Sequence, residues 1–193
     1  MVIQPGEEKL INVIPLSEEE HIEIHERGSA AILIGANRKL RLEVTLIGEG
    51  ASVRIMGRFA GKGADAQEII LRVAERAPKT NCDIRFRAAL SDTSSSFFDG
   101  LIRVEEGATY ARGFLSYKAL LLSPGARAKP IPRLEVLTKE VESLGHEASI
   151  GKIDEEQLFY LQSRGLSRKE AEQLIVEGFL ATPVDANNTA IAS

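Results

Sequence analysis

The fold class follows from the pattern in Leu40-Arg41-Leu42-Glu43-Val44-Thr45-Leu46-Ile47-Gly48-Glu49-Gly50-Ala51-Ser52. Most of its apolar residues stand at every second position, and a glycine-rich turn follows them. Such alternation places one face of a β-strand in a core and the other face in water. The stretch therefore predicts a half-buried strand that ends at a tight corner.

The same pattern recurs from about residue 8 to residue 144, mostly in runs of about three to eight residues, as expected for strands bounded by turns. Further runs lie at 32–34, 53–55, 69–73, 84–87, 101–104 and 134–136. Similar corners lie at 26–30, 48–52, 61–65, 105–109 and 123–127. In each corner a Gly precedes a small residue. Glycine supplies a positive φ at a tight turn, and the small residue lets neighbouring coils stack closely.

Two mainly-β architectures fit this pattern. Short strands at irregular spacing with repeated Gly corners are typical of a β-solenoid, whose loops can vary in length from coil to coil. A β-sandwich also has many short strands separated by turns. Strand patterning alone leaves both open.

The period changes to helical at Asp154. Asp154 with Gln157 resembles a capping box, and Gly165 is the expected stop of this first helix. Ser167 and Glu170 form a fuller capping box that opens a second helix reaching about residue 177.

This helical pair has an apolar stripe and must dock on the body or on a partner, because two short helices bury little alone. The stripe comprises Leu158, Leu161, Leu166, Ala171, Leu174, Ile175 and Phe179. Phe159 and Tyr160 lie on another side of the first helix. We expect a β-rich body over residues 1–152, a helical pair over 153–181 and a flexible tail over 182–193.

Composition narrows the classes of function. A net charge of −4, with 5% aromatic residues and no Trp, argues against a general nucleic-acid binder. The N-terminus lacks the features of a signal peptide, and no apolar run approaches the roughly 20 residues that span a bilayer. We expect a soluble, cytoplasmic protein with no membrane partner.

Few side chains suggest a metal or thiol site. His21, Glu23 and His25 share one face of a predicted strand, where they either hold a metal or form a solvated face. The single cysteine, Cys82, shares its face with Ile84 and is either a small buried hydrophobic residue or a functional thiol.

His146 and Glu147 are the best candidates for a site. As adjacent strand residues they face opposite sides, so they would not form a dyad. His146 could equally meet a backbone carbonyl at a strand end. The chain contains no Gly-x-Ser-x-Gly elbow and no phosphate-binding Gly-x-x-x-x-Gly-Lys loop, so we expect no enzymatic activity of its own.

The stretch from about 73 to 179 resembles the SufB/SufD family of iron–sulfur cluster assembly proteins. The matching segments are 83–86, 98–102, 120–123, 126, 132, 134–136, 146–149, 154–161 and 163–166. The last blocks are the most specific, because a strand end, a capped helix, a Gly stop and a second helix follow in order.

The resemblance implies a right-handed parallel β-helix with a small helical domain, acting as a scaffold. It implies pairing through the β-helix, with a paralogue or with itself, and docking of an ABC-type ATPase, SufC, on the helices. His146 and Glu147 would then be the residues that meet a transient iron–sulfur cluster. The residues implied in packing and ATPase binding are Leu158, Phe159, Leu161, Leu174, Ile175 and Phe179.

Two departures from the family stand out. Its SufB branch carries a cysteine near the position of Tyr117, and no cysteine lies near Tyr117 here. The strand pattern also begins almost at once, so we expect a short member that lacks the family's N-terminal helical region. The alternative to a cluster-binding scaffold is a purely structural β-helix partner that contributes no ligand.

Overall fold

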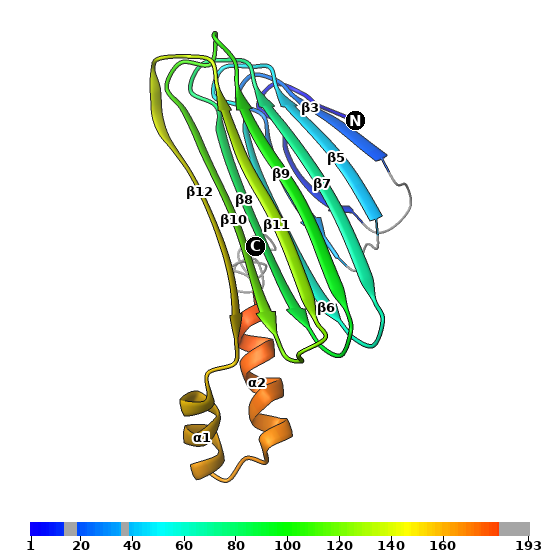
Figure 1. Cartoon of the computed structure of the whole chain (residues 1–193). Helices are drawn as coiled ribbons and strands as arrows, with labels where there is room; N and C mark the ends of the chain where they lie inside the picture. Colours follow the sequence, from blue (N-terminus) through cyan, green and yellow to red (C-terminus); the bar gives the residue numbers. More distant parts are fainter. Residues whose placement is uncertain (14–18, 36–38, 182–193) are drawn as a thin grey trace, which may run out of the picture.

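The body of the molecule is built from two parallel β-sheets that face each other (Figure 1). The computed structural model describes residues 1–13, 19–35 and 39–181. In these residues one sheet has the order β1-β3-β5-β7-β9-β11 and the other β12-β10-β8-β6-β4-β2. Consecutive strands thus alternate between sheets, and each strand pairs in parallel with the strand two further along. This is a parallel β-helix, and it decides between the two predicted architectures, since a sandwich is built from antiparallel sheets.

The first sheet contains β1 (Val2–Ile3), β3 (Glu19–Ile24), β5 (Lys39–Leu46), β7 (Ala66–Glu75), β9 (Ser95–Val104) and β11 (Arg127–Val136). The second contains β2 (Glu8–Val13), β4 (Ser29–Ile34), β6 (Ser52–Gly61), β8 (Asn81–Leu90), β10 (Ala111–Leu121) and β12 (Val141–Lys152). From β6 onward the strands have 10 to 12 residues, so the predicted length of three to eight was too short for this half. Strict alternation fails within some of them. Ile55, Met56 and Gly57 of β6, for example, are all buried in succession.

An aromatic cluster fills the core near the C-terminal coils. Phe86, Phe98 and Tyr117 come from three successive strands, and their ring centroids lie 5.1–5.8 Å apart. Gly57 makes room for this cluster, because a Cβ at that position would lie 2.1 Å from the ring of Phe86. Rings at such separations stabilise a core beyond their buried area.

The corners of the coils differ in part from the prediction. Gly50 and Gly63 have positive φ angles of 71° and 57°, as expected. At other corners the left-handed position is held by residues other than glycine, namely Arg27, Lys79, Asp92 and Tyr110. Gly48 serves close approach instead, because a Cβ there would lie 1.9 Å from the backbone nitrogen of Glu26 in the preceding coil.

Backbone hydrogen bonds between coils fix these left-handed residues. The N–H of Lys79 donates to the carbonyl of Thr109 at 2.8 Å, and the N–H of Tyr110 donates to that of Glu140 at 2.7 Å. Each bond joins one corner to the next coil. The stacking of coils therefore compensates a backbone conformation that L-residues rarely adopt.

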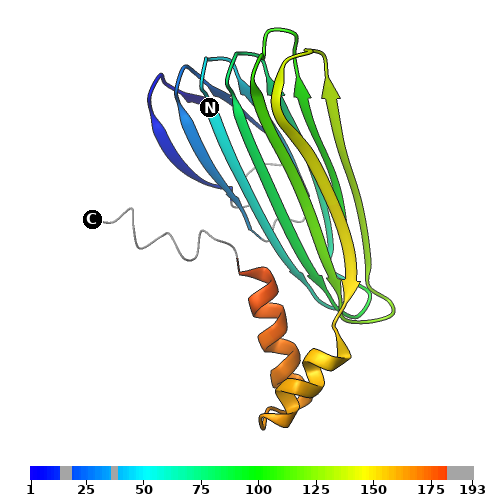
Figure 2. The same ribbon diagram turned by 90° about the vertical axis from the view of Figure 1, so that its left-hand side faces the viewer.

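Two helices follow β12 and project beyond the strand ends (Figures 1 and 2). Helix α1 spans Glu155–Ser163, with Asp154 as its N-cap, and Gly165 follows it at a φ of 98°. Helix α2 spans Arg168–Leu180 and begins with the predicted Ser167–Glu170 capping box. It runs three residues further than expected. No helix in the described ranges is long and apolar enough to cross a membrane.

The helical pair buries less of its apolar stripe than the sequence suggested. Leu158 and Ala171 are buried, but Leu174 is 49% exposed. Arg168 joins the two helices, donating to the Glu155 carboxylate at 2.8 and 3.0 Å and to Glu172 at 3.0 Å. These bonds tie α1 and α2 into one hairpin. The predicted tail at 182–193 lies outside the described residues.

Candidate functional site

Strand β12 carries both candidate site residues at one end of its sheet. In register with β10, His146 stands beside Leu115 and Glu147 beside Ser116. Leu115 is a buried core residue, so His146 lies on the face that continues the lumen of the β-helix, at its open end. Glu147 lies on the outer face of the sheet. The two side chains do not form a dyad, as the strand pattern predicted.

Glu147 has two polar partners on β10. The Ser116 hydroxyl donates to Glu147 Oε1 at 2.7 Å, and Lys118 Nζ lies 3.0 Å from the same oxygen. These contacts, the Ser116 hydrogen bond first, lower the pKa of the Glu147 carboxyl below its ordinary value. The carboxylate is 44% exposed. Glu147 therefore presents an ionised carboxylate of fixed orientation at the outer surface.

His146 is exposed on β12, in the last coil of the body. The same coil also carries the exposed apolar side chains of Val136, Leu137, Val141 and Ile150, each 37–48% accessible. Neither β11 nor β12 has a further strand on its outer edge in the described part of the chain. Unpaired sheet edges with apolar side chains are typical of interaction surfaces.

No thiol reaches this open end. Cys82 is 1% exposed, and burial followed by the nearby Glu75 charge raises the pKa of its thiol. Its interpretation as a small buried hydrophobic residue fits this position. Tyr117 is fully buried beside Phe86, and burial raises the pKa of its hydroxyl to about 12 although Ser96 opposes the change.

The strand residues His21 and Glu23 face outward, as predicted. His21 Nε2 lies 3.5 Å from Glu23 Oε1, and His21 Nδ1 lies 3.8 Å from Glu43 Oε2 on the neighbouring strand. His25 directly follows the last residue of β3 and is half-buried. The described residues contain no cluster of three or more His, Cys, Asp or Glu arranged to hold a metal ion. The metal hypothesis for this strand thus has no support in the geometry.

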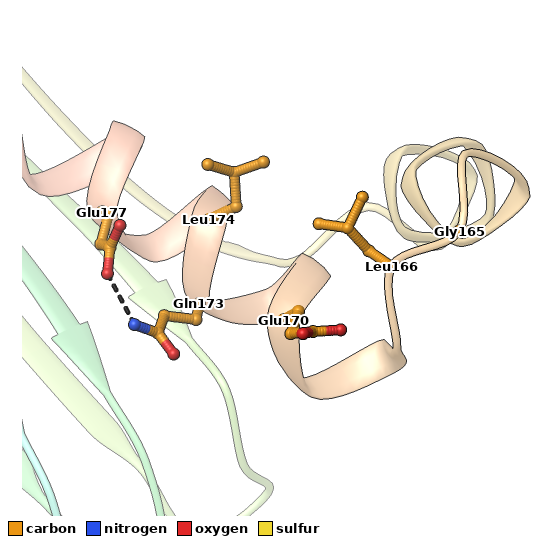
Figure 3. A pocket seen from close by; sticks show the side chains of 6 residues that line it. All are labelled: Gly165, Leu166, Glu170, Gln173, Leu174 and Glu177. Carbon is orange, nitrogen blue, oxygen red and sulfur yellow. Dashed lines mark hydrogen bonds between the residues drawn. The ribbon is translucent and has the colours of Figure 1, made fainter.

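The α1–α2 hairpin presents a second candidate surface. Phe159, Tyr160 and Leu174 are 74%, 57% and 49% exposed. Leu166 and Leu174 project to the same side of a shallow hollow of about 390 Å³ beside the turn between the helices (Figure 3).

The other predicted partner-binding residues are less accessible. Leu158 is only 1% exposed and is packed beneath the hairpin, so it is not free to meet a partner. Leu161, Ile175 and Phe179 are half-buried. Phe179 also packs under a guanidinium, with Arg87 Cζ 5.8 Å from its ring centre.

Sequence reasoning missed the residues that support these candidates. Ser116 and Lys118 reach Glu147 from 31 and 29 positions earlier in the chain, through the β10–β12 register. Arg87 reaches Phe179 across 92 positions. No local motif marks such partners, because only the coil length sets which residues become neighbours.

The chain is similar to proteins of known family. The family model described as "SUF system FeS cluster assembly, SufBD core domain" matches residues 27–179. An iron–sulfur cluster assembly SufBD family protein of Mycobacterium leprae is 34% identical over 168 residues, which cover 76% of this chain and 43% of the relative. Its counterpart in Staphylococcus haemolyticus is 33% identical over 162 residues, covering 81% and 34%.

A third relative, from Staphylococcus saprophyticus, is 36% identical over 136 residues, which are 70% of this chain and 29% of that protein. The aligned part is thus less than half the length of each of these relatives. The matched region takes in the β-helix from strand β4 onward, including β12, and nearly all of both helices. The family model covers most of the chain and the strand order is that of a β-helix, so this protein belongs to the SufBD family of iron–sulfur cluster assembly proteins.

Proposed function

We propose that this chain is a non-enzymatic scaffold in iron–sulfur cluster assembly that docks a SufC-like ABC-type ATPase through the α1–α2 hairpin. The observation that carries the proposal is the exposure of Phe159, Tyr160 and Leu174 on a hairpin projecting from the body. Large apolar side chains gathered on a projecting element mark protein-binding surfaces. The ATPase is the class of partner that the resemblance to the SufB/SufD family implies.

A second β-helix, either another copy or a paralogue, would pair at the open C-terminal end. Strand β12 is the better edge for this pairing, because all its residues retain the backbone N–H. Strand β11 contains Pro130 and Pro132, which have no N–H to donate. The exposed Val141 and Ile150 of β12 would be covered by the same contact.

The nascent cluster is the cargo of this scaffold. His146 offers an imidazole nitrogen on the lumen side of β12, and Glu147 offers a carboxylate on the outer side. Both ligand types bind iron. Because they face opposite ways, a cluster held at one face needs ligands from the pairing partner as well.

The alternative, a purely structural partner that contributes no ligand, is favoured by one observation. The only cysteine of the chain is buried in the core, and Tyr117 occupies the region where the SufB branch has its cysteine. Measuring iron and acid-labile sulfide in the anaerobically purified complex distinguishes the cluster-binding scaffold from the purely structural partner. A loss of both with His146→Ala supports the cluster-binding scaffold, whereas equal content supports the structural partner.

Titration calorimetry with the SufC-like ATPase of the same organism tests the docking. The variant Phe159→Asp/Leu174→Asp places a carboxylate at an exposed apolar position of each helix and should weaken binding by at least about tenfold, or 1.4 kcal/mol. The control Gln157→Asp/Gln162→Asp adds the same charge at exposed polar positions of α1 and should bind like the wild type. A folded wild type that does not bind would refute the docking proposal.

A further inference from the structure

The C-terminal end of α2 has no cation of its own. Its last turn contains no basic residue, although the final carbonyls of a helix carry partial negative charge and lack intrahelical donors. The body supplies the cation. Arg87 Nη1 of β8 donates to the carbonyl of Phe179 at 2.7 Å and to the carbonyl of Ala181 at 2.9 Å.

The same guanidinium lies over the ring of Phe179 at 5.8 Å from its centre. Phe179 and Leu180 are half-buried, so this end of α2 is its seat on the body. Arg85, two residues earlier on the same face of β8, behaves differently, because it pairs with Asp83 at 3.0 Å. Of these two arginines of β8, Arg87 is the one that bonds the end of α2.

Between its seat and the hairpin turn, α2 lies over a groove of about 960 Å³. Arg58, Lys62 and Leu122 line the groove from the body, and Val176 and Leu180 line it from α2. The groove leaves part of the space between α2 and the sheet open to solvent.

At the other end, the hairpin is held where it leaves β12. Leu158 is the one buried residue of α1, and it lines a small cavity with Leu121, Leu122 and Ile153. Arg168 ties α1 to α2, so the two helices form one connected hairpin. Its contacts with the body include the Leu158 contact at one end and the Arg87 contact at the other.

We propose that Arg87 is a positioning residue that latches the α1–α2 hairpin onto the β-helix, with the Leu158 contact as the hinge. Breaking two hydrogen bonds and one ring contact at Arg87 frees the hairpin without disturbing the core. The functional consequence rests on the proposed ATPase docking. A force applied to the docked hairpin would act on β8 at Arg87, whose neighbour in register, Lys118, holds Glu147.

Hydrogen–deuterium exchange of the full chain, without any ATPase, tests the latch. Arg87→Gln should raise the exchange rate of α2 amides about tenfold and leave the strands unchanged, because a helix of this length is marginal once undocked. Arg87→Lys keeps a cationic donor and should restore most of the protection. Arg85→Gln is the matched control on the same strand and face.

The latch is overturned if Arg87→Gln and Arg85→Gln give the same exchange in α2, or if Arg87→Lys exchanges as fast as Arg87→Gln. Fast exchange in Arg87→Gln alone, with Arg87→Lys protected, supports it. These outcomes do not depend on docking. A wild type that fails to bind the ATPase would remove the proposed function and leave the exchange result standing.

Discussion

Glu75, the last residue of β7, makes the stability of this β-helix depend on pH. It is fully buried, and neither carboxylate oxygen has a hydrogen-bond partner in the described part of the chain. Burial raises the pKa of Glu75 to about 8, from 4.5 in its ordinary state. The neutral form is therefore favoured in the folded protein.

The sign of the effect follows from the two pKa values. Below pH 4.5 the carboxyl is protonated in both folded and unfolded chains and has no ionisation cost. Between pH 4.5 and about 8 only the unfolded chain ionises, so stability falls by about 1.4 kcal/mol per pH unit. Over this rise of about 3.5 units the full loss is on the order of 5 kcal/mol.

Glu75→Gln removes the titration while keeping the size and polarity of the side chain. The free energy of unfolding should be measured in urea at pH 5, 6, 7, 8 and 9. From pH 5 to pH 7 the free energy of unfolding of the variant should rise by about 2–3 kcal/mol relative to that of the wild type. The difference should level off above about pH 8. Glu106→Gln, at an exposed corner, controls for the loss of one negative charge. Parallel pH profiles of wild type and Glu75→Gln would refute the assignment.

Three further predictions concern the core. The buried Cys82 thiol should react with a thiol reagent at least about a thousandfold more slowly in the folded chain than in urea, and rapid native labelling would contradict its burial. Tyr117→Ala should lower the free energy of unfolding by about 3–5 kcal/mol, whereas Tyr110→Ala, 53% exposed, should change it by less than about 0.5 kcal/mol. Gly57→Ala should cost about 1–3 kcal/mol in chemical denaturation, because its Cβ would enter the ring of Phe86, and an unchanged midpoint would show that the ring moves aside.

Local pattern was sufficient to predict strands over much of the body, the inward face of Cys82 and the N-cap residues Asp154 and Ser167. It was not sufficient for the full strand lengths, nor for the capping partner of Asp154, which is the backbone N–H of Glu156 and not Gln157. Alternation and capping depend on residues within a few positions of one another, which a sequence displays directly. The opposite orientation of His146 and Glu147 followed from the same rule. The exposure of Leu174 did not, because a helical stripe reveals which residues share a face but not how much of that face is covered.

Contacts between coils could not be predicted from the local sequence pattern. Which strands pair, and hence that Lys118 meets Glu147, depends on coil lengths that vary along the chain. At the corners of Arg27 and Lys79 the left-handed position itself is not a glycine, since hydrogen bonds from the next coil enforce a conformation that these residues disfavour. The need for Gly57 appears only once the ring of Phe86 occupies the adjacent strand.

The stacking of coils also determines which strands should unfold locally first. In a solenoid each coil contacts only its neighbours, so stability is close to a sum of nearest-neighbour terms. Strand β12 pairs with β10 on one side only within the described chain, and it is therefore among the first to fray. His146 and Glu147 thus stand on a strand that we expect to open before the interior coils do.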